Sequence, residues 1–172
     1  MSDAEGTGPV EDTVQMEVKG LMLDPSSNVP IVILRDLEKT LFLPIWIGMA
    51  EAQAIALRIE GVQTPRPLTH DLVLQAILKL GASVEKIVVS NLEESTFYAE
   101  IHLQQGGELV RIDARPSDAI AVALRAEAPI FVRRAVLEKA QAVSTGPEPS
   151  DEERLKKWLE ELDPEDLGRY TM

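Results

Sequence analysis

The sequence predicts an α+β fold. We expect a single compact domain with a mixed, mostly antiparallel sheet of about six to seven strands, packed with Ala-rich helices and followed by a C-terminal amphipathic helix. Three observations lead to this prediction. A chain of 172 residues, 45% of them hydrophobic, suits one domain with its own core. Some segments alternate apolar and polar residues as strands do, and others repeat apolar residues at helical spacing. Gly and Pro separate these segments at short intervals.

The first third of the chain predicts three strands. Alternation over residues 14–23 indicates a half-buried strand. Residues 24–28 are rich in turn formers, and the apolar run 29–34 that follows completes a hairpin. A third strand is expected over residues 40–47. Pro44 lies inside it, and because proline has no amide hydrogen to donate, it predicts a sheet edge, a bulge or the end of the strand.

Two helices follow. Residues 49–60 place apolar side chains on one face, and Gly61 can end that helix. A second helix is expected over residues 70–80, with Thr69 as its N-cap and Gly81 after its last turn.

The next segment returns to strands, over residues 84–90, 96–103 and 108–113. Gly106-Gly107 is a favourable hairpin turn between the last two. Within residues 96–103 the odd-numbered positions are apolar and the even-numbered positions are polar. We therefore expect His102 on the solvated face.

The domain then ends with a helix, a short strand and another helix. Pro116 suits the first turn of a helix that runs to about residue 126. Its segment 119–124 is apolar on all sides, which predicts a central, buried helix. A short strand at residues 130–132 and a helix at residues 133–142 complete the domain.

The chain divides into three regions. Residues 1–12 predict a disordered acidic tail, residues 13–145 the domain, and residues 146–172 an acidic linker and helix. Apolar residues recur around Trp158 at the spacing of an amphipathic helix. We expect this helix to dock on its own domain or on a partner.

Charge and composition limit the possible functions. The net charge is −12, to which the first tail contributes −4, the last region −5 and the domain −3. Acidic tails disfavour tight, non-specific binding of nucleic acid, although a local basic site remains open. There is no cysteine, so thiolate chemistry and disulfides are excluded. The N-terminus lacks the pattern of a secretory signal, and the longest nearly apolar run, residues 41–50, is too short to cross a bilayer. We therefore expect a cytoplasmic protein without a membrane segment.

Polar residues gather at three points where the chain changes direction. Taken singly, the acids there suit the first turns of helices, where the helix dipole favours negative charge, and the arginines suit ion pairs. Taken together, two or three carboxylates could hold Mg²⁺ or Mn²⁺, two arginines could grip phosphate, and a histidine could move a proton. The expected metal ligands are Glu51, Asp113 and Asp118, the phosphate ligands Arg66 and Arg115, and the catalytic residues Glu51, His70, Asp71, Asp113 and Asp118. The sequence indicates no organic cofactor.

Several long motifs resemble the bifunctional nuclease domain family. The clearest is DARPSDAIA at residues 113–121, followed by API at residues 128–130. Others are LPIWIG at residues 43–48, followed by Glu51-Ala52 and Glu60-Gly61, PRPLTHDL at residues 65–72, and TFYA at residues 96–99. The resemblance covers residues 14–142 in unbroken order. It implies a compact α+β domain, often oligomeric, from a family credited with cutting RNA and DNA and with many bacterial members.

The expected function is therefore hydrolysis of phosphodiester bonds, assisted by a divalent cation. A homo-oligomer is expected, with a dimer favoured. Two alternatives stay open at this point. The same motifs could serve only as helix caps and salt bridges in a non-catalytic interaction module. The site could also bind a small phosphorylated or carboxylated molecule, which a near-neutral domain suits better than a long polyanion.

Overall fold

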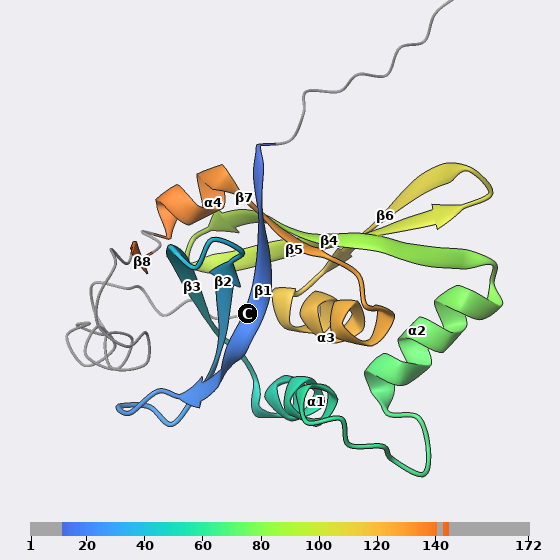
Figure 1. Ribbon diagram of the computed structural model, residues 1–172, viewed down its shortest axis with the longest axis horizontal. Helices are drawn as coiled ribbons and strands as arrows, with labels where there is room; N and C mark the ends of the chain where they lie inside the picture. Colours follow the sequence, from blue (N-terminus) through green and yellow to red (C-terminus); the bar gives the residue numbers. More distant parts are fainter. Residues whose placement is uncertain (1–11, 141–142, 145–172) are drawn as a thin grey trace, which may run out of the picture.

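The computed structural model describes residues 12–140 and 143–144, and Figure 1 shows its elements along the chain. Helices and strands alternate much as the sequence predicts, with boundaries shifted by only a few residues. The strands are β1 (Thr13–Leu23), β2 (Pro30–Asp36), β3 (Leu41–Trp46), β4 (Ala82–Glu93), β5 (Thr96–Gln105), β6 (Glu108–Ala114), β7 (Ile130–Arg133) and β8 (Val143–Ser144). The helices are α1 (Met49–Ile59), α2 (Thr69–Lys79), α3 (Pro116–Ala126) and α4 (Arg134–Lys139).

The described strands form one sheet in the order β6-β5-β4-β7-β1-β2-β3-β8. The pairing is parallel between β4 and β7 and antiparallel between the other neighbours, so the predicted mixed, mostly antiparallel sheet is confirmed. The count exceeds the expected six to seven because β8, which has only two residues, pairs with Leu41 and Phe42. A strand of two residues is too short to show alternation of apolar and polar residues, so it could not be predicted from the sequence.

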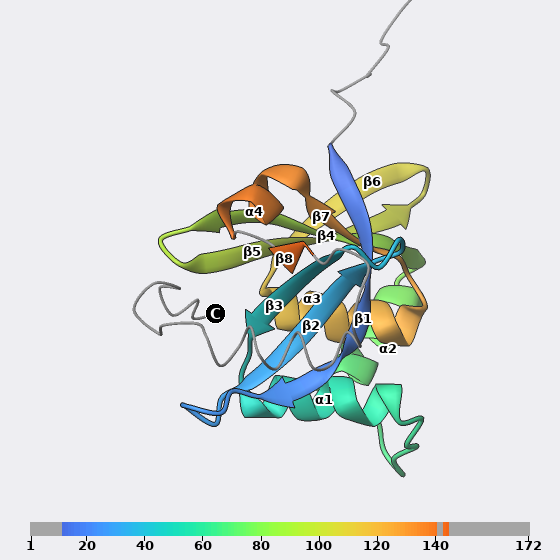
Figure 2. The same ribbon diagram turned by 60° about the vertical axis from the view of Figure 1, so that its left-hand side comes forward.

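The sheet bends strongly, and α3 lies in the angle between its two halves (Figures 1 and 2). As predicted, α3 is central: residues 119–123 are at most 1% exposed. Three of those five residues are alanines, which lets the helix approach the strands closely. The same main core includes Met16, Leu34, Ile55, Ile87 and Ile101. The buried helix α3 therefore forms the surface against which α1 and α2 pack.

Pro44 sits in β3 opposite Ile33 of β2. On its other side, the pairing of β8 with β3 reaches only Leu41 and Phe42. Pro44 thus lies where the described sheet ends, which confirms the edge position that its missing amide hydrogen predicts.

Two local predictions were wrong. The N-cap of α2 is Leu68 rather than Thr69, and the Asp71 carboxylate accepts the Leu68 amide hydrogen at 2.8 Å. This bond from the third helical residue back to the Leu68 amide fixes the start of the helix one residue earlier than the N-cap predicted at Thr69. His102 is 1% exposed instead of solvated. Its cross-strand neighbours are Lys86 in β4 and Arg111 in β6, and long side chains at such positions can shield a ring from water.

The predicted helix around Trp158 and the acidic N-terminal tail lie outside the described residues. Within the described residues, no helix has the length and hydropathy that a membrane crossing requires.

Candidate active site

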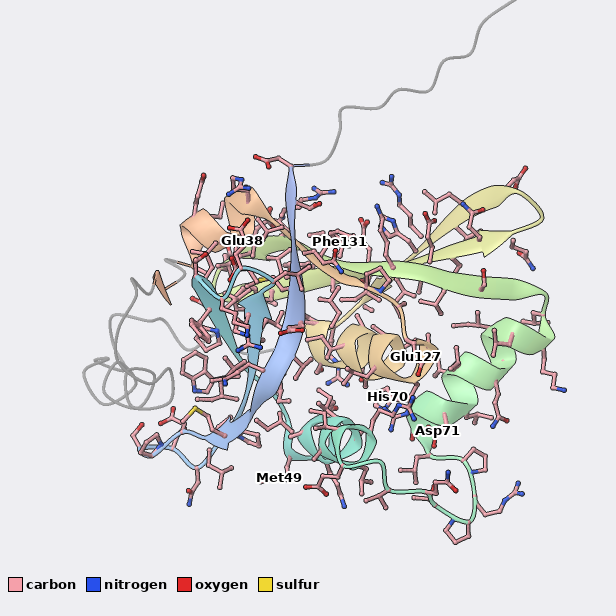
Figure 3. The ribbon with its side chains drawn as sticks, in the orientation of Figure 1. Glu38, Met49, His70, Asp71, Glu127 and Phe131 are labelled. Carbon is pink, nitrogen blue, oxygen red and sulfur yellow. The ribbon has the colours of Figure 1, made fainter. Side chains whose placement is uncertain are left out.

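The first turns of α1, α2 and α3 converge on one cleft. Glu51 comes from α1, His70 from α2 and Asp118 from α3, and Arg115 is the residue immediately before α3. All four side chains line a cleft of about 730 Å³, whose walls also include Val73, Ile101 and Val122. In Figure 3, His70 lies at the end of α2 that faces α1 and α3.

A continuous chain of hydrogen bonds joins these four side chains. The Arg115 guanidinium donates from Nη2 to Glu51 Oε1 at 2.8 Å and from Nε to Asp118 Oδ2 at 2.9 Å. The other oxygen of Asp118, Oδ1, lies 2.8 Å from His70 Nε2. Asp118 therefore connects the cation to the imidazole, and residues up to 67 positions apart in the sequence form a single polar unit.

The local sequence explains why the helices begin here. Pro116 occupies the first turn of α3, where its missing amide hydrogen costs nothing. Acids at the third position of α1 and α3 interact favourably with the amino end of the helix dipole. Gly48, the N-cap of α1, makes room for Glu51, because a Cβ atom on Gly48 would collide with Oε2 of Glu51.

The electrostatics favour the charged forms of Asp118 and Arg115. Burial alone would raise the pKa of Asp118, but hydrogen bonds from His70 and Arg115 outweigh it and hold that pKa below its ordinary value. The hydrogen bond to Asp118 raises the pKa of Arg115, and Glu51 adds to this effect against the opposing effect of burial. The ionised carboxylate of Asp118 accepts a hydrogen bond from the N–H group at Nε2 of His70, which leaves the lone pair on Nδ1.

Arg66 and Asp71 lie beside this cleft rather than in it. Both line a neighbouring pocket of about 460 Å³, which shares Leu57, Thr64 and Leu68 with the cleft. Asp71 is fully occupied there: besides capping α2 through Oδ2, it accepts a 2.6 Å hydrogen bond from Arg125 at Oδ1. This arrangement suits a structural role for Asp71.

Asp113 lies on the opposite face of the sheet from Asp118. Its neighbour Ala114 packs against the main core, and successive side chains of a strand point to opposite faces. Asp113 instead lines a pocket of about 450 Å³ with Glu100 and Arg111. The expected set of three carboxylates, Glu51, Asp113 and Asp118, therefore does not come together. More generally, within the described ranges no three His, Asp or Glu side chains are grouped to hold a metal ion.

Sequence reasoning missed Arg125, whose side chain is 6% exposed. Besides Asp71, its guanidinium donates to the carbonyl oxygens of Ala54 in α1 and Ala121 in α3, at 3.1 and 3.0 Å. It thereby ties the three helices together behind the cleft. A basic residue in the last turn of a helix is common at surfaces, so no local signal distinguished this arginine.

Comparison with known proteins identifies relatives of the domain. The sequence pattern of the Bifunctional nuclease domain matches residues 32–145. An uncharacterised protein of Mycobacterium tuberculosis is 40% identical over 164 residues, which cover 89% of this chain and 97% of that protein.

Plant proteins are also similar. Bifunctional nuclease 2 of Oryza sativa subsp. japonica is 31% identical over 123 residues, or 69% of this chain and 38% of that protein. Bifunctional nuclease 1 of Oryza sativa subsp. indica is 24% identical over 131 residues, or 74% of this chain and 40% of that protein. The similarity to the plant proteins is thus confined to less than half of their length.

Proposed function

This chain belongs to the bifunctional nuclease domain family, and from that premise we propose that it hydrolyses phosphodiester bonds in RNA or DNA at the cleft where α1, α2 and α3 begin. The observation that carries the proposal is the hydrogen-bonded chain Glu51–Arg115–Asp118–His70. In this chain a guanidinium, a group well suited to binding phosphate, and an imidazole are hydrogen-bonded to the same carboxylate. The amino ends of three helices add to the attraction for an anion.

Arg115 is the proposed phosphate ligand. Its side chain is 51% exposed, and its bonds to Glu51 and Asp118 use only Nη2 and Nε. A guanidinium has five N–H groups, so donors remain for two phosphate oxygens. The two carboxylates hold the guanidinium in a fixed orientation before substrate arrives, which reduces the entropy lost on binding.

His70 is the proposed proton carrier. With Nε2 donating to Asp118, Nδ1 can take a proton from a water molecule as the water oxygen forms a bond to phosphorus. As the bond from phosphorus to the leaving oxygen breaks, the imidazolium returns that proton to the leaving oxygen. Asp118 acts as a positioning residue that fixes the tautomer and stabilises the charged ring.

A divalent cation remains part of the proposal. Glu51 and Asp118 are the carboxylates that line the cleft. Mg²⁺ is often bound by one or two carboxylates together with phosphate oxygens and water, so this pair fits such an ion. Because both carboxylates bond Arg115, a cation would compete with the guanidinium for them. Arg66, in the neighbouring pocket, is the proposed contact for a further phosphate.

The test is a cleavage assay with the purified full chain on single- and double-stranded RNA and DNA, with and without chelator. We expect Asp118→Asn to lower the rate by roughly 10²- to 10⁴-fold, as loss of positioned acid–base catalysis does. The matched control is Glu100→Gln, because Glu100 bonds His102 at the same 2.8 Å on the opposite face of the sheet.

Cleavage that persists in Asp118→Asn reveals a contaminating enzyme or a different site, and rejects the proposal. The proposal is also rejected if the unaltered chain cleaves none of the four substrates. Binding of a small phosphorylated molecule in that case would favour the small-anion alternative. Its affinity should change little with salt, whereas affinity for a long nucleic acid falls steeply.

A further inference from the structure

The strand β6 forms one edge of the sheet and is exposed along its length. It is the terminal strand, and residues 108–113 are all exposed. The exposed residues include three large apolar ones: Leu109 at 45%, Val110 at 38% and Ile112 at 41%. An exposed, apolar edge strand readily pairs with another strand, and proteins usually block such edges with lysine, proline or a covering segment. The opposite edge has those protections, since β3 contains Pro44 and β8 covers its start.

The two faces of β6 differ in character. Val110, Ile112 and Ala114 lie opposite Leu103, Ile101 and Ala99 of β5, which are core residues, so they face the helices. Leu109, Arg111 and Asp113 point to the other face. In the part of the chain that the structure describes, neither Arg111 nor Asp113 forms a hydrogen bond or an ion pair through its side chain. The edge thus presents a cation and an anion two residues apart, both available to another chain.

We propose that a second copy of this chain pairs along β6, antiparallel and related by a two-fold axis through Ile112. In this register Arg111 of each copy lies opposite Asp113 of the other, which forms two reciprocal ion pairs. The two copies of Ile112 lie opposite each other at the centre, and Val110 lies opposite Ala114. Side chains that share a face of β6 stay on the same face of the joined sheet, as antiparallel pairing requires.

Charge selects this register over its neighbours. A two-fold axis through Arg111 would place two arginines directly opposite each other. An axis through Val110 would oppose Arg111 with Leu109 and Glu108 with Ile112. Only the axis at Ile112 matches opposite charges with each other and apolar side chains with each other, so it satisfies both requirements at once.

The pairing would join the two sheets and keep the helices of both copies on one side. Ile112 is the cross-strand neighbour of Ile101, which lines the cleft with His70 and Arg115. The two clefts would therefore open on either side of the shared strand pair. The assembly does not depend on whether the cleft is catalytic, and its test uses no activity measurement.

The test is sedimentation equilibrium of the full chain over a range of protein concentrations. We expect a reversible dimer. Arg111→Asp places an aspartate of one copy opposite Asp113 of the other, and Asp113→Arg places an arginine opposite Arg111. Because like charges repel, each single variant should raise the dimer dissociation constant by about tenfold or more. The double variant R111D/D113R restores opposite charges and should return the constant to within about threefold of the unaltered chain.

Ile112→Lys, which places two lysines at the axis, should be monomeric, and its circular dichroism spectrum should match that of the unaltered chain. Leu109→Gln is the matched control, because in the proposed register Leu109 lies opposite Arg115, beyond the end of β6, and an uncharged glutamine adds no repulsion there. A chain that stays monomeric at all concentrations overturns the proposal. A dimer that the two single charge variants leave unchanged, or that the double variant fails to restore, also overturns it, because the interface would then lie elsewhere.

Discussion

His70 and His102 each lie 2.8 Å from a carboxylate oxygen through Nε2, yet their surroundings give them different possibilities. His70 pairs with Asp118 across 48 residues, lines a cleft, and is linked through that carboxylate to Arg115. His102 pairs with Glu100 within one strand, and its side chain is 1% exposed. Its Nδ1 is buried without a hydrogen-bond partner.

The difference shows that a histidine–carboxylate pair does not by itself make a site. A base must reach a substrate, and a phosphate needs a cation nearby. The His70 pair meets both conditions because helix termini surround it. The His102 pair fails the first condition, because its imidazole is 1% exposed, although Lys86 and Arg111 are its cross-strand neighbours. The buried Nδ1 of His102 instead lowers the stability of the fold, because it has lost its hydrogen bonds to water and has no partner in the protein.

The largest expected effect comes from exchanging each histidine for glutamine. His70→Gln removes the proposed proton carrier and should lower the cleavage rate by roughly 10²- to 10⁴-fold, with little change in the midpoint of thermal unfolding. His102→Gln should leave the cleavage rate within about twofold at temperatures where the chain is folded, because it lies away from the cleft. Rates and unfolding curves measured on both variants check this contrast. If His70→Gln and His102→Gln lose activity equally, the two histidine–carboxylate pairs do not differ in their part in cleavage.

A smaller effect is expected from Gly48→Ala. The new Cβ atom would push the Glu51 carboxylate away from Arg115 without changing any charge. Since Arg115 is half exposed, the lost ion pair should lower the cleavage rate by only roughly fivefold.

The matched control is Gly20→Ala, because a Cβ atom on Gly20 would meet no atom within 4 Å. If Gly48→Ala and Gly20→Ala cleave at the same rate, Glu51 does not help to orient Arg115.

The smallest effect concerns the pH dependence of stability. Because the folded state lowers the pKa of Asp118, its ionised form stabilises the fold above the ordinary pKa of 3.8. That contribution is lost as the pH falls from there through the lowered pKa. Asp118→Asn cannot ionise, so its free energy of unfolding should fall less than that of the unaltered chain between pH 5 and pH 2.

Urea denaturation across that pH range measures the difference. Asp36 and Asp71 also have lowered pKa values, so both proteins should weaken in acid, and only the difference between them reports on Asp118. Parallel curves would mean that the bonds from His70 and Arg115 do not stabilise the charged carboxylate.

Much of the fold was predictable because its signals are local. Alternation in β1, the Gly106-Gly107 turn and the apolar surface of α3 all follow from residues close together in the chain. The prediction for His102 failed because alternation separates two faces of a strand but does not reveal what covers either face. Here the cross-strand neighbours of His102 are Lys86 in β4 and Arg111 in β6, which come from other parts of the chain.

The candidate site was only partly predictable. Glu51, His70, Arg115 and Asp118 were all named from the sequence, and they meet. Asp113, five residues before Asp118, does not join them, because one residue of strand alternation turned it to the other face. Arg125 went unnoticed, because its three partners come from three different helices.

The sequence by itself determined most of the secondary structure, the order of those elements and the family, since periodicity, turn residues and motifs depend on near neighbours. Only the tertiary structure decided which residues share a cleft. Three helices must pack at set angles before their first turns meet, and those angles are fixed by contacts between residues far apart in the chain. The small residues of α3 and the buried guanidinium of Arg125 supply these contacts.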